Sequence, residues 1–272
     1  MLARAKVTFA ENVGCNVSDE MILDQVAENI RLQLPQAKPH QPNPETIALV
    51  CGGPSLKQTE KELVEAVWQG AKVCAVNGAY QWCIDHNIKP SVMVMLDARK
   101  FNARFVATPV PGCRYLLASQ CHSRAFELCA DRIVVLWHAC SAGQPELDML
   151  KEFYFEKCHP VTLGTTVSIR AISLLRMLGF QSFDIFGLDS CILDNEHHAY
   201  AQPENDRDKR IPVWLEGCDE KFIVTPWMAK QCQDVQQLII ERGNTFRLNV
   251  RGPGLIAAIL RTGAKLHLPT KE

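Results

Sequence analysis

An apolar segment that runs into a glycine turn and then into a helix constrains the fold of this chain most. Residues 47–51 are Ile-Ala-Leu-Val-Cys, and a helical pattern begins at about Lys57. Such a turn can hold a phosphate, because glycine lets the backbone approach closely and the N–H groups of the helix N-terminus carry partial positive charge. The alternative is that the glycine and serine residues of this turn serve the geometry of the chain alone. The candidate phosphate-binding residues are Gly52, Gly53, Pro54 and Ser55.

The same alternation of short apolar strands and amphipathic helices continues along the chain. We expect strands at 46–51, 72–76, 91–96, 114–118, 132–137 and 182–186. We expect helices at 57–69, 79–87, 99–106, 122–129 and 167–178. This order is typical of a mostly parallel sheet covered by helices on both faces. The predicted fold class is therefore α/β, a Rossmann-like doubly wound sheet.

The N-terminal part has a different organisation. Ser18 is a helix cap, and Ile22, Val26 and Ile30 recur at helical spacing, which predicts an accessory helix over about 19–34. Four prolines between 35 and 44 then predict an extended connector. We divide the chain into an N-terminal helical arm and Pro-rich linker at 1–44 and one Rossmann-like domain at 45–272.

Composition excludes several classes of protein. With 47% apolar and 22% charged residues the chain can bury a substantial core, and a net charge of -1 gives no general attraction to a nucleic acid polymer. No apolar run approaches the ~20 residues of a membrane span, and the first residues lack a signal-peptide core, so we expect a cytoplasmic protein. The twelve cysteines form no C-x-x-C pair and are expected to be reduced and buried. A homo-oligomer is compatible with the sequence.

Polar residues follow three of the predicted strands, at the edge where ligands bind in such sheets. Asn77 can contact a base or ribose; its alternative is a helix cap or a left-handed turn before Gly78. Asp97 can bind Mg²⁺, which prefers hard oxygen ligands, or it can cap the next helix. Asp189 can be a metal ligand, a catalytic base or a ribose contact.

Two further segments carry candidate residues. Gly164, Thr165 and Thr166 precede the helix expected at 167–178 and can form an anion cradle, with an ordinary threonine cap as the alternative. The long charged loop at 190–222 contains His197 and His198, either of which can act as a general base or bind a phosphate. Solvated loop histidines are the alternative. We expect this loop to close over the acceptor.

These motifs, taken together, resemble those of a known family. The segments Cys51-Gly52-Gly53-Pro54-Ser55-Leu56, Val76-Asn77-Gly78-Ala79, Leu96-Asp97, Gly164-Thr165-Thr166-Val167 and Phe186-Gly187-Leu188-Asp189 are similar in order and spacing to those of the archaeal 6-hydroxymethylpterin diphosphokinases. That family also includes the motility accessory factors of flagellated bacteria. The resemblance covers about residues 45–190, and the tail resembles the end of the same domain.

The resemblance implies a nucleotide-dependent diphosphokinase. ATP or GTP would bind over residues 52–55, Mg²⁺ would be held by Asp97 with Asp189, and a small hydroxyl acceptor such as a hydroxymethylpterin would attack the β-phosphorus. Arg99, Lys100 and Arg104 are candidate cations.

The motif order is also similar to that of bacterial lipooligosaccharide sialyltransferases, which implies a glycosyltransferase with a nucleotide sugar, a glycan acceptor, and His197 or His198 as base. A non-catalytic nucleotide-binding module is the third alternative.

Overall fold

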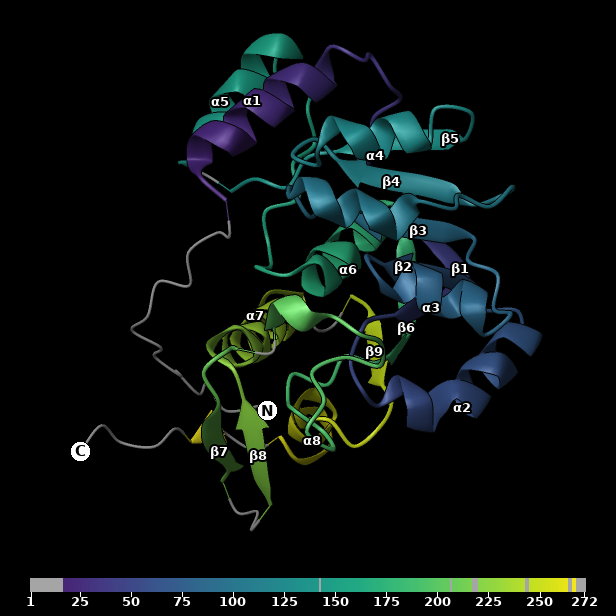
Figure 1. Cartoon of the computed structure of the whole chain (residues 1–272), viewed down its shortest axis with the longest axis vertical. Helices are drawn as coiled ribbons and strands as arrows, with labels where there is room; N and C mark the ends of the chain where they lie inside the picture. The colour runs from purple at the N-terminus through teal and green to yellow at the C-terminus, as the bar shows by residue number, and fades with distance from the viewer. Residues whose placement is uncertain are drawn as a thin grey trace.

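The centre of the computed structural model is a sheet of seven parallel strands (Figure 1). The structure describes residues 17–141, 143–205, 207–216, 220–242, 245–263 and 266–267. The spatial order of the strands is β5-β4-β3-β2-β1-β6-β9. Their bounds are β1 Asn43–Val50, β2 Lys72–Val76, β3 Val92–Met95, β4 Arg114–Ala118, β5 Ile133–Trp137, β6 Phe180–Phe186 and β9 Arg247–Val250. The predicted doubly wound α/β fold is confirmed.

The strand order reverses between β1 and β6. β1 pairs with β2 on one side and with β6 on the other, so the chain winds outward from β1 to β5 and then returns to the far side of β1. Ligands bind at such a switch point, beyond the carboxyl ends of the strands. The ends of β1 and β6 lead into the turns at Gly52 and Gly187, the first of which was predicted to bind phosphate.

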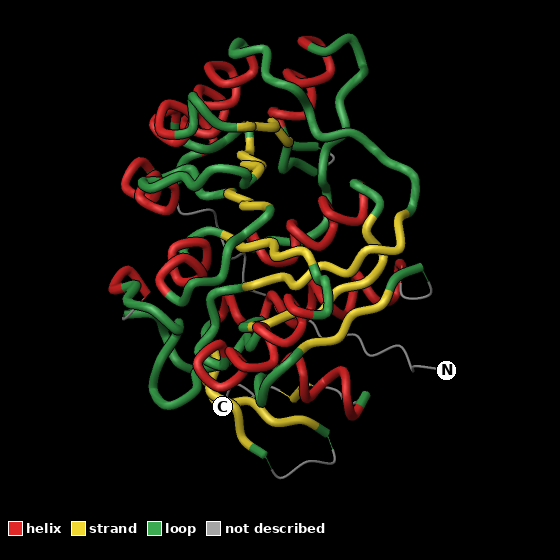
Figure 2. The backbone as a smooth tube through the Cα atoms, turned by 90° about the vertical axis from the view of Figure 1, so that its right-hand side faces the viewer, coloured by secondary structure: helices red, strands yellow, loops and turns green. Residues whose placement is uncertain are grey.

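Helices cover both faces of the sheet, as Figure 2 shows. The connections from β1 to β5 contain α2 Leu56–Trp68, α3 Ala79–Asp85, the 3-10 helix η1 Lys100–Val106 and α4 Ser123–Leu128. Right-handed crossovers place these on one face. The return to β6 reverses direction, so α6 Val167–Met177 covers the other face, where it contacts β2, β3 and β6.

The N-terminal helix α1, Asp19–Ile30, is shorter than expected and packs against α4 and α5. Its Asn29 side chain donates to the backbone carbonyls of Ser119 (2.8 Å) and Cys121 (2.6 Å), beyond the end of β4. The connector is extended as predicted and lies along the edge of β5, where the N–H of Ala37 donates to Leu136 O at 2.8 Å. Residues 1–16, on which the absence of a signal peptide rested, lie outside the described residues.

Several elements were not predicted from the sequence. They are α5 Pro145–Phe153, α8 Leu255–Thr262, and a small antiparallel sheet of β7 Ile211–Leu215, β8 Lys221–Val224 and β10 Leu266–His267. The tail also contains α7 Pro226–Arg242. The loop expected over 190–222 therefore contains a strand, and the small sheet lies at one end of the molecule, apart from the main sheet (Figure 1). None of the described helices has the length and apolar character needed to cross a membrane.

Candidate functional site

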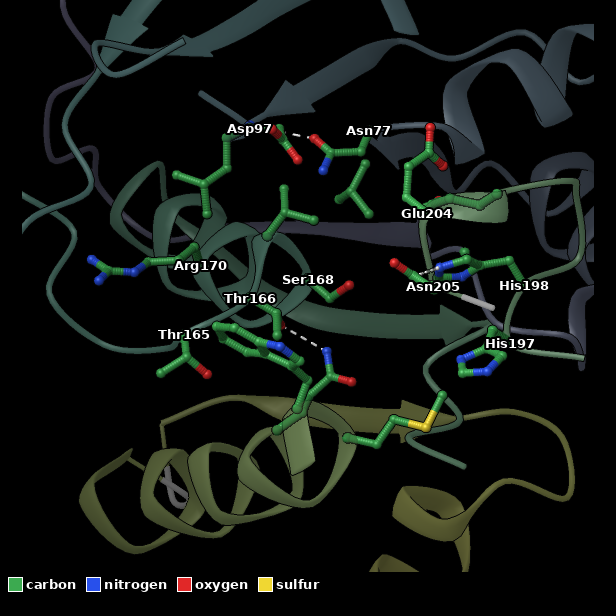
Figure 3. Close-up of a pocket in the computed structure, with 18 of the residues that line it drawn as sticks. Asn77, Asp97, Thr165, Thr166, Ser168, Arg170, His197, His198, Glu204 and Asn205 are labelled. Carbon is green, nitrogen blue, oxygen red and sulfur yellow. Dashed lines mark hydrogen bonds between the residues drawn. The ribbon is translucent and has the colours of Figure 1, made fainter. Parts of the chain in front are cut away.

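A cavity of about 590 Å³ opens at the carboxyl edge of the sheet, around the switch point between β1 and β6. This volume is in the range of small-molecule sites. The cavity brings together residues from beyond the carboxyl ends of β1 to β6, the start of α6 and the loop after β6, several of which Figure 3 labels. It is lined by every predicted site residue except Pro54, Ser55 and Gly164, and by Arg99 among the three candidate cations. Their roles remain predictions, but their convergence is now a geometric fact.

The first glycine turn is packed against the chain's own residues. The N–H of Gly53 donates to Gly187 O at 2.8 Å, and a Cβ at Gly53 would meet Asp189 Oδ2 and lie 2.6 Å from Gly187 O. A side chain at Gly53 would therefore collide with the neighbouring turn. The glycine is therefore required by chain packing.

Asp189 occupies the N-terminus of α2. Its Oδ2 accepts a hydrogen bond from the backbone N–H of Ser55 at 2.9 Å, while its Oδ1 is buried without a hydrogen-bond partner among the described residues. Burial raises the pKa of Asp189, although the hydrogen bonds from Ser55 oppose this. The helix N-terminus that was predicted to attract phosphate thus already holds a carboxylate, which would repel one.

Tyr200 fills the space in front of two glycines. A Cβ at Gly52 would lie 2.5 Å from Tyr200 Oη, and a Cβ at Gly78 would lie 2.6 Å from Tyr200 Cε2. The ring also stacks on His198, with centroids 5.6 Å apart. The glycines at these two strand ends therefore accommodate an aromatic ring of the chain itself, which the sequence reading did not include in the site.

Asp97 and Arg99 form an ion pair at the end of β3. Arg99 Nη2 donates to Asp97 Oδ2 at 2.7 Å, and Arg99 Nε and its backbone N–H donate to Oδ1 at 3.0 and 2.9 Å. Burial raises the pKa of Asp97, but hydrogen bonds from Arg99 and Asn102 outweigh it and the pKa is lowered. Of the other candidate cations, Arg104 pairs with Glu204 at 2.8 Å and Lys100 is exposed.

The predicted Mg²⁺ site is only partly compatible with this arrangement. Both oxygens of Asp97 accept hydrogen bonds from Arg99, so a metal ion at Asp97 would compete with this ion pair, and its role as a metal ligand remains a prediction. Asp189 offers one unpartnered oxygen. Within the described ranges, no group of three or more His, Cys, Asp or Glu residues is placed to hold a metal ion.

Asn77 adopts the left-handed conformation that was its structural alternative, with φ of 42°. Its Oδ1 accepts from the backbone N–H of Leu96 at 3.3 Å, which ties the end of β2 to the end of β3. Asn77 also lines the cavity, so its contact with a base or ribose remains a prediction.

The start of α6 faces the cavity with polar groups. The backbone N–H and Oγ1 of Thr165 donate to Asp234 Oδ2 at 2.7 and 2.6 Å, and Lys230 pairs with the same carboxylate at 2.8 Å. Thr166 Oγ1 accepts from Gln231 Nε2 at 2.7 Å and makes no capping hydrogen bond. The two threonines therefore anchor α7 to α6.

Arg170 and Ser168 follow on the same helix and line the same cavity. Arg170 Nε donates to Gly164 O at 2.5 Å, and Nη1 donates to Val161 O. It forms no ion pair with any residue that the structure describes, and burial lowers its pKa. Together with the N–H groups of the first turn of α6, which lack intrahelical acceptors, Arg170 adds positive character to this end of the cavity.

The two histidines are not solvated loop residues, so that alternative is wrong. His197 is 8% exposed, and His198 Nε2 lies 2.8 Å from Asn205 Nδ2. Burial lowers the pKa of His198 to about 4, so its imidazole is neutral at pH 7. The loop is held down by an ion pair between Lys57 and Glu196 at 2.5 Å and by the Ala199 N–H, which donates to Gly52 O.

The sequence reading missed several cavity residues, four of which lie in segments that it had singled out. They are Glu146, Arg170, Tyr200, Glu204, Asn205, Trp227 and Gln231. The sequence offered a signal only for Tyr200, which is an isolated aromatic residue in a charged loop, two residues after His198.

The chain is similar to known proteins in both sequence and fold. The family described as 6-hydroxymethylpterin diphosphokinase MptE-like matches residues 20–228. No curated protein matches the chain. A solved structure of the MAf glycosyltransferase from Magnetospirillum magneticum AMB-1 superposes with a TM-score of 0.62 at 13% identity, over 93% of this chain and 43% of that one. The chain thus spans less than half the length of that structure, and the likeness concerns the fold.

Proposed function

Because the chain belongs to the 6-hydroxymethylpterin diphosphokinase MptE-like family, we propose that it is a nucleotide-dependent transferase. A phosphate of the donor binds at the N-terminus of α6. The observation that carries this placement is the contrast between two helix N-termini at one cavity. Each holds a carboxylate: Asp189 at the start of α2 forms no ion pair among the described residues, whereas Asp234 at the start of α6 is paired with Lys230 and Arg170 lies on the same helix. An anion is stabilised at the second and repelled at the first.

We favour a nucleotide sugar as the donor. The acceptor hydroxyl oxygen forms a bond to the anomeric carbon, the bond from that carbon to the phosphate oxygen breaks, and the nucleotide leaves with the electron pair. The engagement of Asp97 by Arg99 supports this choice, because an ion held by Asp97 and Asp189 together would have to compete with the Asp97–Arg99 ion pair. The glycosyltransferase activity named for the structural neighbour is consistent with it.

A base must accept the proton of the attacking hydroxyl. His198 is poorly suited, since a group with a pKa of about 4 holds a proton weakly at pH 7. We assign the role to His197, which lines the cavity beside it, and assign His198 to positioning the loop through Asn205.

Diphosphoryl transfer is the second candidate, favoured by the description of the family. The acceptor oxygen would bond to the β-phosphorus of ATP or GTP, and the nucleoside monophosphate would leave. Magnesium bound to a nucleotide needs one or two protein carboxylates, and Asp189 Oδ1 could supply one; the ion would neutralise phosphate charge.

The two donors are separated by a thermal-shift panel of nucleotide sugars, ATP and GTP, with and without Mg²⁺, because a ligand of the native state raises the melting temperature. We expect stabilisation by a nucleotide sugar without Mg²⁺. Stabilisation only by ATP or GTP with Mg²⁺ would favour diphosphoryl transfer, and no stabilisation by any nucleotide would refute the proposed function.

The position of the phosphate is tested by calorimetry on Arg170→Met. We expect about tenfold weaker nucleotide binding, a loss of one charge-assisted hydrogen bond. Arg176→Met, on the same helix but outside the cavity, is the matched control. Ser168→Ala is a second variant in case Arg170→Met does not fold. Unchanged affinity in both would place the phosphate elsewhere.

A further inference from the structure

The cavity extends beyond the predicted nucleotide residues to a region between α1 and α5. Asp19 and Ile22 of α1, Gln120 after β4, and Gln144 and Glu146 at the start of α5 line this end. In Figure 3 the side chain of Arg170 extends away from His197 and His198. None of these residues except Arg170 belongs to the proposed donor site.

Glu146 is the unusual residue of this region. It is 7% exposed and lies in the first turn of α5, and its Oε2 atom is buried without a hydrogen-bond partner in the described part of the chain. A first-turn carboxylate is stabilised by the helix dipole, but it normally keeps its solvation. A buried carboxylate oxygen without a donor costs free energy, so its place in a cavity wall points to a ligand that donates to it.

The neighbours of Glu146 indicate what that ligand is. Burial raises the pKa of the Cys140 thiol to about 11, and the charges of Glu146 and Arg170 act on this thiol in opposite directions, which puts both charges near it. This end of the cavity therefore contains charges of both signs. Gln144 uses Oε1 to accept from the Ser141 N–H at 2.6 Å, which leaves its Nε2 as a donor, and the Gln120 amide adds a further donor and acceptor.

We propose that this end of the cavity is an acceptor subsite for a neutral, hydroxyl-rich molecule of the monosaccharide class. One of its hydroxyl groups donates to Glu146, and the amides of Gln120 and Gln144 contact its other hydroxyl groups. An anionic acceptor would meet the carboxylates of Asp19 and Glu146, and a cationic acceptor would meet Arg170. The assignment rests on the proposed function, because it places the acceptor next to the phosphate end of the donor.

The experiment measures the binding of three probes that share a ring but differ in charge: glucose, glucosamine and glucuronate. Saturation-transfer NMR is recorded for each at neutral pH, with and without nucleotide. The proteins are the wild type, Glu146→Gln, Gln120→Ala and Glu152→Gln. Glu152 is an exposed residue of the same helix, so its variant makes the same charge change outside the cavity.

We expect glucose to give the strongest signal and its affinity to fall about tenfold in Glu146→Gln, because a charge-assisted hydrogen bond becomes a neutral one. Gln120→Ala should weaken it less, and Glu152→Gln should match the wild type. Preferential binding of glucosamine or glucuronate, equal glucose binding in the wild type and Glu146→Gln, or no glucose signal under either condition would each overturn the subsite.

The outcome is separable from that of the proposed function. Glu146-dependent glucose binding without any nucleotide binding would refute the transferase and retain the subsite. Nucleotide binding without glucose binding would refute the subsite and retain the transferase.

Discussion

The ring of Tyr200 lies against two glycines from different strand ends, and this packing predicts a specific double-mutant pattern. A Cβ at Gly52 would meet chiefly the hydroxyl, since Tyr200 Oη is 2.5 Å away and Cζ is 3.2 Å away. A Cβ at Gly78 would meet the ring itself, with Cε2 at 2.6 Å and Cζ at 2.8 Å. Removing the hydroxyl should therefore relieve the first collision and not the second.

Overpacking of a buried site costs about 1–3 kcal/mol. We expect Gly52→Ala to lose about 1–2 kcal/mol and Gly78→Ala about 2–3 kcal/mol of unfolding free energy, with ~2–4 °C of melting temperature per kcal/mol in a chain of this size. Tyr200→Phe should restore most of the first loss, because the remaining 3.2 Å contact needs a shift of only a few tenths of an ångström.

Urea denaturation of the wild type, the three single variants and the two double variants measures both coupling energies. Equal rescue of the two glycine variants by Tyr200→Phe, or no loss in Gly52→Ala, would show that Tyr200 does not occupy this slot in solution.

Three further changes give distinct readouts. Burial raises the pKa of Asp189, so the native state binds more protons than the unfolded state. The stability therefore falls as pH rises from the ordinary carboxyl pKa of about 3.9. Asp189→Asn should abolish that fall, as measured by urea denaturation across pH. The lowered pKa of Asp97 contributes stability at pH values above its unfolded pKa, and this stability is lost as pH falls through the folded pKa. Arg99→Met should raise the pKa of Asp97 in an NMR titration. An unchanged pKa would show that the ion pair does not form in solution. Arg104→Ala removes the Glu204 ion pair at ~1 kcal/mol or less and should speed proteolysis at 201–210, whereas Arg124→Ala, which breaks an exposed pair on α4, should not.

The sheet could be predicted from the sequence because each strand is a short apolar run, such as Lys72–Val76 or Arg114–Ala118, whose bounds the structure reproduces. The place of β10 in the small sheet could not, since it depends on pairing between Leu215 and Leu266, which are far apart in the chain, whereas β7 and β8 pair locally. The expected helix at 99–106 is a 3-10 helix that begins beside the ion pair of Asp97 and Arg99.

The convergence of the site was predictable from strand ends, but the partners within it were not. Ser55 and Asp189 form their hydrogen bond across 134 positions of sequence, and Tyr200 meets Gly52 and Gly78 through a loop whose path no local pattern specifies. A glycine turn before a helix therefore identified the correct edge of the sheet while leaving open what fills the space in front of it.

Electrostatics explains why the two helix N-termini at this edge are not equivalent. Two like charges about 4 Å apart repel by ~4 kcal/mol at an effective dielectric constant near 20, so a phosphate beside the Asp189 carboxylate forfeits more than the helix dipole returns. The carboxylate near α6 belongs to Asp234, whose charge is offset by Lys230 at 2.8 Å, and Arg170 adds a positive charge. A donor anchored by its phosphate at α6 would have the histidines at one end of the cavity and Glu146 near the other. The acceptor must then extend from Glu146, which holds one of its hydroxyl groups, toward His197, which takes the proton of the hydroxyl group that attacks.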